Sequence, residues 1–196
     1  MKNSILIILF IFYQILFFNK LHAKEIEFDA SDIEINDTQN LTIANNGIAK
    51  IKDDGIVVEG VKIKYFKDQS LIVVEKGKIS KIDSNLNITS GTIEYNLKNS
   101  KINFTDKVNI DDKINNLIIY SDEISYDVIN QKISGKSNTK IIDEFDNTYE
   151  VSQFEYSTKN RIIKLANTKV SDRDKNTFDL EVAYLDLNKK EIVAKD

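Results

Sequence analysis

Ile93-Glu94-Tyr95 is one copy of the short unit that decides the fold of this 196-residue chain. The unit is an apolar residue, a polar residue and a second apolar residue. Its copies begin at positions 33, 63, 93, 124, 154 and 184, so their spacings are 30, 30, 31, 30 and 30 residues. A constant period of this kind is the sequence signature of a repeat architecture. The copies are Ile33-Glu34-Ile35, Ile63-Lys64-Tyr65, Ile93-Glu94-Tyr95, Ile124-Ser125-Tyr126, Phe154-Glu155-Tyr156 and a degenerate Tyr184-Leu185-Asp186.

The segments between the copies predict further strands. Apolar and polar residues alternate at Leu41/Ile43, Ile56/Val58 and Val108/Ile110, which is the period of a strand with one buried face. Polar turns such as residues 67–70 separate these segments, and outside the N-terminal segment no window has helical apolar spacing. A propeller blade needs about 40 residues or more. The period therefore favours an all-β, twisted, partly open β-jelly roll built from units of about 30 residues.

The composition excludes several classes of function. The chain has no cysteine, its single histidine is His22, and its formal net charge is −4. Without a leader that contains Lys2 and Lys20, 25 basic residues stand against 31 acidic ones, and the net charge is −6. An acidic chain without a basic cluster has no general attraction for nucleic acid. The absence of cysteine excludes disulfides and a lipid-modified cysteine.

The first 23 residues have the pattern of a secretory signal peptide. Lys2 supplies a positive start, residues 5–18 are apolar except for Gln14, and Ala23 is a small residue at the expected cleavage position. We expect cleavage after Ala23, which leaves residues 24–196 as one exported domain. An uncleaved membrane anchor is the alternative, although the apolar run is shorter than the roughly 18 residues of a spanning helix.

The chain offers no convincing catalytic or metal site. Once the leader is removed, it has neither imidazole nor thiol, the usual general base, nucleophile and zinc ligand. Two carboxylates can act together in glycosidases, but the acidic pairs Asp53-Asp54, Asp111-Asp112 and Asp143-Glu144 fall at predicted turns. A calcium-loop opening at residues 172–176 lacks the required glycine and glutamate. We expect a protein that is not an enzyme and needs no cofactor or metal.

The repeated unit resembles the lipopolysaccharide-transport β-jelly rolls, the OstA-like family. The resemblance lies in Asp32-Ile33-Glu34-Ile35 with residues 44–51, in residues 60–65 with 77–82, and in residues 121–126. It extends over residues 26–196. The usual small-Gly-Asn-Val motif is altered to Asn46-Gly47-Ile48 in the first unit, and the glycine is missing from the third and fifth units. Within the family, the drifted motifs most resemble the N-terminal periplasmic segment of LptD, with LptA and LptC as alternatives.

The resemblance implies that an apolar interior shields lipopolysaccharide acyl chains and passes them across the periplasm to the outer membrane. It also implies edge-to-edge pairing with other Lpt jelly rolls. The final unit stops partway at residues 191–196, so we expect either a docked partner or a longer polypeptide. A barrel continuation would add an outer-membrane lipoprotein plug as a partner. The predicted lipid-groove residues are Ile33, Ile35, Ile63, Tyr65, Ile93, Tyr95, Ile124, Tyr126, Phe154 and Tyr156.

The sequence leaves a second function open. The same ten side chains suit the packed core of a closed sandwich equally well, because buried apolar residues are the rule in any folded domain. In that case the protein is a structural or adhesive exported β-repeat protein without lipid cargo. The alternation alone does not distinguish a groove from a core.

Overall fold

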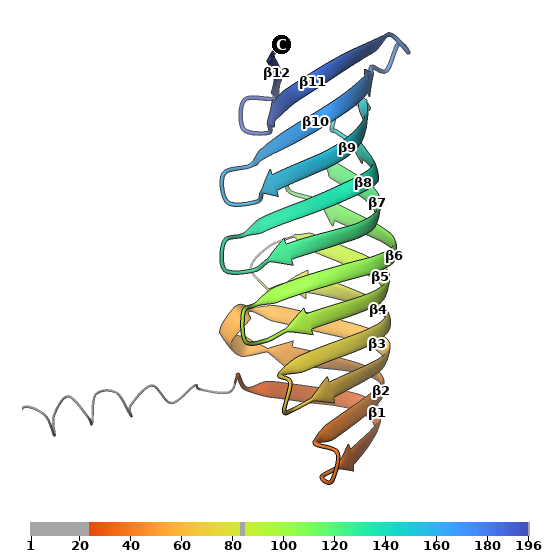
Figure 1. The fold of residues 1–196 in the computed structure, drawn as a ribbon, viewed down its shortest axis with the longest axis vertical. Coiled ribbons are helices and arrows are strands. Elements are labelled where there is room, and N and C mark those ends of the chain that lie inside the picture. Colours follow the sequence, from red (N-terminus) through yellow and green to blue (C-terminus); the bar gives the residue numbers. More distant parts are fainter. Residues whose placement is uncertain (1–23, 83–84, 196) are drawn as a thin grey trace, which may run out of the picture.

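The computed structural model describes residues 24–82 and 85–195. They form one antiparallel sheet of 12 strands, and every strand pairs with the next one along the chain (Figure 1). The all-β expectation is therefore confirmed. The predicted signal peptide lies outside the described residues. The strands are β1 (Ile26–Asn36), β2 (Leu41–Ile51), β3 (Ile56–Phe66), β4 (Leu71–Lys81), β5 (Leu86–Asn96), β6 (Lys101–Asp112), β7 (Leu117–Asp127), β8 (Lys132–Ile142), β9 (Thr148–Ser157), β10 (Ile162–Ser171), β11 (Thr177–Asp186) and β12 (Glu191–Lys195).

The hairpin turns follow the sequence repeat. The turns that follow the odd-numbered strands form the first row of turns. In most of them a side-chain oxygen at the start of the turn accepts a hydrogen bond from a backbone N–H two or three residues later. The residues that supply this oxygen are Asn36, Asn96, Asp127, Ser157 and Asp186. Short polar side chains stabilise turns in this way. Each of these turns ends on a residue with positive φ immediately before the next strand. These residues are Asn40, Ser70, Ser100, Gln131, Arg161 and Lys190.

Most strands bend near the middle, and the bend folds the sheet over on itself. The even-numbered strands β2 to β10 each have a non-glycine residue with positive φ at this point: Asn46, Lys76, Asp106 with Lys107, Asn138 and Asn167. In β2 the buried residues before the bend are Thr42 and Ala44, at even positions. After the bend they are Gly47, Ala49 and Ile51, at odd positions. Both halves of one strand therefore direct alternate side chains into the same interior.

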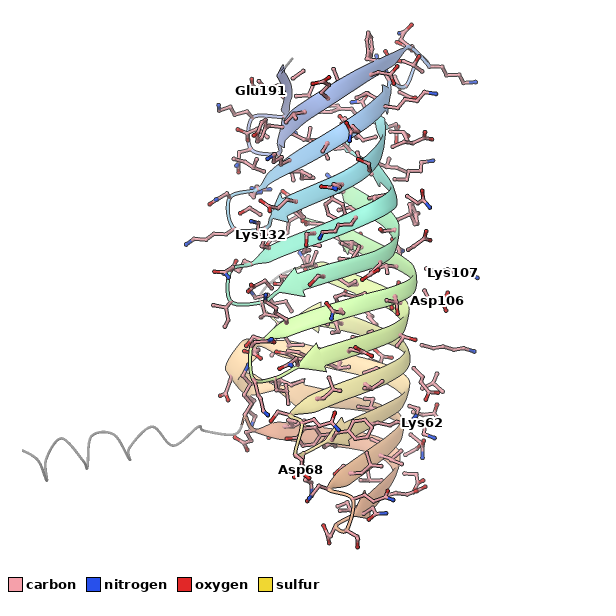
Figure 2. The ribbon with its side chains drawn as sticks, in the orientation of Figure 1. Lys62, Asp68, Asp106, Lys107, Lys132 and Glu191 are labelled. Carbon is pink, nitrogen blue, oxygen red and sulfur yellow. The ribbon has the colours of Figure 1, made fainter. Side chains whose placement is uncertain are left out.

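The folded sheet has two walls that meet at the bend, and the turns connect neighbouring strands within each wall (Figure 1). Wall one consists of the strand halves next to the first row of turns. Wall two consists of the halves next to the second row, which connects β2–β3, β4–β5, β6–β7, β8–β9 and β10–β11. Charged side chains such as Lys107 at the bend and Lys132 on the turn side project outward (Figure 2).

Two features of the fold limit its surroundings. Among the described residues, β1 and β12 each have a strand neighbour on one side only, so the sheet is open at both ends. In the same part of the chain, no helix has the length and apolar character needed to cross a bilayer. The helical segment that the structure describes there is a single 3-10 turn at Lys52–Asp54.

Candidate functional site

The interior between the two walls is apolar and continuous from β2 to β11. Eight of the ten predicted groove residues lie on wall one in this region. Tyr65 among them is half-buried, and the other seven are at most 3% exposed. These seven are Ile63, Ile93, Tyr95, Ile124, Tyr126, Phe154 and Tyr156. These eight side chains form one side of the interior, and their role in holding lipid stays a prediction.

The remaining two, Ile33 and Ile35, are exposed on the edge strand β1, at 42% and 63%. They pair with Ala44 and Thr42, both buried, and directly paired residues of an antiparallel ladder share a face. They therefore face inward as predicted. They are exposed because β1 is an edge strand of the sheet, with one strand neighbour in the described structure.

Sequence reasoning missed wall two as part of the site. Its side chains complete the interior, and the alternation at Ile56/Val58 and Val108/Ile110 was the signal that could have identified them. They were recognised as strands with a buried face but not as the opposite side of the same cavity. The wall two residues that are fully or almost fully buried include Ile51, Ile56, Val58, Ile79, Ile88, Val108, Ile110, Leu117, Ile119, Ile141, Tyr149 and Val151.

Glycines at the bend allow the interior to be filled. A Cβ atom built on Gly135 would lie 2.4 Å from Cε1 of Phe154, and one built on Gly60 would lie 2.2 Å from Cγ1 of Val74. Real Cβ atoms do not approach other atoms this closely, so these large side chains occupy the space that the missing Cβ leaves. The interior of this structure is a packed one.

Opposite the bend, the two rows of turns meet along a seam that polar side chains bridge. The first bridge is centred on Asp54 in the second row. Its carboxylate accepts hydrogen bonds from the hydroxyl of Tyr95, from Ser100 Oγ at 3.3 Å and from Lys24 Nζ at 2.5 Å. The side chain of Asp54 is only 10% exposed.

A second bridge repeats this arrangement further along the seam. The Tyr156 hydroxyl donates to Asp112 Oδ2 at 2.5 Å and accepts from Asn115 Nδ2 at 2.8 Å. Arg161 Nε in turn donates to Asn115 Oδ1 at 2.7 Å. A third bridge joins Lys190 Nζ to Glu144 Oε2 at 2.8 Å.

The bridges follow the period of the fold. The first two each connect residues 41 and 46 positions apart, and the third connects residues 46 apart. They are side-chain contacts, each of which contributes about 0.5–3 kcal/mol. The seam can therefore separate without loss of any hydrogen bond in the backbone ladder. Besides these side-chain contacts, apolar packing between the two walls holds the seam closed.

Two surface hollows lie at the bend. One has a volume of 1010 Å³ and lies over β8–β11, and the other has a volume of 940 Å³ and lies over β1–β6. Both are open to solvent, and polar or charged side chains such as Lys136, Glu150 and Lys78 line them. A ligand pocket is usually concave and mostly apolar with a few convergent polar groups. The interior has the apolar character and, at its seam, the polar groups, but its own side chains fill it in this structure. Within residues 24–82 and 85–195, no cluster of carboxylates could hold a metal ion.

The family model for lipopolysaccharide-assembly proteins related to LptC matches residues 4–170 of the chain. This chain belongs to the LptC-related family. The match confirms the lipopolysaccharide-transport family that the repeat indicated. It falls on LptC, one of the two alternatives to the LptD segment that the drifted motifs favoured.

One solved structure that resembles the LptC-related protein is that of LptH from Pseudomonas aeruginosa. It is described as the LptA-homologous periplasmic component of the conserved lipopolysaccharide transport device. The two chains are 12% identical, the alignment covers 88% of this chain and 96% of LptH, and the TM-score is 0.30. No curated protein sequence matches the LptC-related chain.

The buried tyrosines of the LptC-related protein predict alkaline unfolding. Burial raises the pKa of Tyr126 to about 12, and burial with a carboxylate neighbour raises the pKa of Tyr95, Tyr149 and Tyr156 further. Unfolded tyrosine ionises near pH 10, so folding loses stability above that pH as the unfolded state releases protons first. Tyr126 alone accounts for roughly 2–3 kcal/mol by pH 12.

We expect a cooperative loss of β circular dichroism above about pH 10, together with a rise in tyrosinate absorbance. The Tyr126→Phe variant should lose a smaller part of its stability over the same pH range. Tyrosinate absorbance that rises at ordinary tyrosine pH while the protein stays folded would contradict the burial of these hydroxyls.

Proposed function

We propose that this protein holds lipopolysaccharide acyl chains between its two walls and passes them across the periplasm to related jelly rolls, for assembly in the outer membrane. The observation that supports this most strongly is the continuous apolar interior closed along one side by a few polar bridges. An acyl chain gains about 0.8 kcal/mol for each methylene that leaves water. Ten methylenes would contribute about 8 kcal/mol, to be set against about 0.5–3 kcal/mol for each side-chain contact that opens.

The open sheet ends supply the sites of transfer in this proposal. Edge strands offer unpaired backbone N–H and C=O groups to another chain. Stacking of a related jelly roll on β1 or β12 would extend the interior from one protein into the next. Transfer in this scheme is a movement of cargo between apolar surfaces, so the protein acts as a carrier rather than as an enzyme.

A photocrosslinking experiment tests the interior path. A photoreactive phenylalanine analogue at Phe104, which is fully buried on β6, is expected to crosslink to lipopolysaccharide. The matched control places the analogue at Asn103, the exposed neighbour on the opposite face of the same strand. Crosslinking at position 104 and none at 103 supports the proposal.

A well-folded protein with no crosslink at position 104 would contradict lipid binding in the interior. The filled interior of this structure would then favour the other function, an exported structural or adhesive β-repeat protein. That protein would form concentration-dependent oligomers through its sheet edges and contain no lipid.

A further inference from the structure

One level of the seam lacks its bridge. Tyr95, Tyr126 and Tyr156 occupy equivalent positions on β5, β7 and β9, at the row-one end of wall one. The hydroxyls of Tyr95 and Tyr156 bond to Asp54 and Asp112 across the seam. The hydroxyl of Tyr126 is buried, the residue being only 1% exposed, and within the part of the chain that the structure describes it has no hydrogen-bond partner.

A buried hydroxyl without a partner is destabilising, and buried polar groups are almost always satisfied by protein or solvent. Burial raises the pKa of Tyr126 to about 12, so the phenol retains its proton at neutral pH and remains a donor. The missing partner is therefore a hydrogen-bond acceptor.

A cavity of 280 Å³ lies at this level of the seam, and Tyr126 is part of its lining. Gln131 and Thr158 contribute from the first row of turns, and Lys81 and Asn85 contribute from the opposite wall. Leu86 and Ile114 give the lining an apolar part. The cavity therefore joins polar groups at the seam to apolar side chains beside them.

The cavity has two cations available for a ligand. Lys81 and Arg161 both line it, and neither forms an ion pair within residues 24–82 and 85–195. The carboxylate of Asp112 also lines the cavity, but it already accepts bonds from Tyr156 and Asn115. Two cations and a phenol donor favour an anion with several oxygens, which phosphate supplies.

We propose that this cavity is a phosphate-binding site in which Tyr126 donates to a phosphate oxygen and Lys81 and Arg161 balance its charge. The phosphate belongs either to the headgroup of a lipid whose chains lie in the interior or to free phosphate. The lipid source rests on the function proposed above, whereas the phosphate chemistry does not. Because the cavity exceeds the size of one phosphate and has an apolar part, it favours the lipid headgroup.

Binding to the full chain can be measured by nuclear magnetic resonance with labelled tyrosine side chains. The probes are inorganic phosphate, dihexanoyl phosphatidic acid and, as a lipid without net charge, dihexanoyl phosphatidylcholine. We expect phosphatidic acid to shift the Tyr126 signal and the Tyr126→Phe substitution to weaken its binding by about 10-fold or more. Lys81→Gln is expected to weaken binding as well.

The Tyr120→Phe variant is the matched control, because Tyr120 lies on the same strand and is 44% exposed. It should bind phosphatidic acid like the original protein. Thermal unfolding separates a binding role from a structural one. Tyr126→Phe is expected to keep or raise Tm because it removes an unsatisfied hydroxyl, whereas Tyr156→Phe breaks two hydrogen bonds and should lower Tm.

The probes distinguish the two sources. A response to phosphatidic acid alone supports the lipid headgroup, and a response to inorganic phosphate as well supports a phosphate site that needs no chain. Equal binding by the original protein and Tyr126→Phe overturns the site, even if lipopolysaccharide crosslinks at Phe104. Tyr126-dependent binding of inorganic phosphate with no crosslink at Phe104 supports the site and overturns the proposed carrier function.

Discussion

Replacement of Phe154 with alanine is expected to lower the free energy of unfolding by about 3–5 kcal/mol. Phe154 is 3% exposed, and its ring fills the space beside Gly135 at the bend of β8. The substitution removes apolar contacts and leaves a cavity that the two walls cannot fill without moving. Denaturant-induced unfolding, followed by circular dichroism, measures the change.

A second substitution tests whether Gly135 provides that space. Gly135→Ala alone should destabilise the protein by about 1–3 kcal/mol, because the new Cβ would lie 2.4 Å from the Phe154 ring. In the Phe154→Ala background the same methyl group enters an empty volume. The double variant is therefore expected to be more stable than the sum of the single changes predicts, by about 0.5–3 kcal/mol.

Phe178→Ala is the matched control for the first substitution. Phe178 lies on β11 and is 55% exposed, so its truncation should cost less than about 1 kcal/mol. Additive effects at positions 135 and 154 would show that the ring and the glycine are not packed against each other. A small effect of Phe154→Ala would show that the interior is loosely filled.

A covalent tether across the seam is expected to abolish lipopolysaccharide crosslinking at Phe104. Glu144 and Lys190 lie on opposite rows of turns and form an ion pair at 2.8 Å. The chain contains no cysteine, so Glu144→Cys with Lys190→Cys places two unique thiols there. A short, reducible bis-maleimide that joins them keeps the two walls together, and reduction should restore loading.

The control tether joins Glu150→Cys to Lys169→Cys. These exposed residues are direct partners on β9 and β10, so this tether stays within one wall and leaves the seam free. Loading should continue with this control. If the seam tether also leaves loading intact, acyl chains reach the interior through the sheet ends and not through the seam.

The sequence by itself determined the architecture and one wall of the site. The period of 30 or 31 residues and the alternation along each strand are local properties, and they predict which side chains of wall one face inward. The repeated turns at residues such as Asn36, Asn96 and Asp127 are equally local, since each side chain caps its own backbone. Eight of the ten predicted residues are accordingly buried or half-buried.

Only the tertiary structure decided how the two walls combine. The positive-φ bends of the even-numbered strands shift the buried alternation within a strand, so wall two belongs to the same interior. Ile33 and Ile35 match the pattern but are exposed, because burial depends on neighbouring strands and, in the described part of the chain, β1 has one on one side only. The partners of Tyr95 and Tyr156 lie 41 to 44 residues away, and among the described residues Tyr126 between them has none. Such contacts depend on which turns face each other across the seam. A local sequence pattern does not predict this, because the facing turns are far apart in the chain.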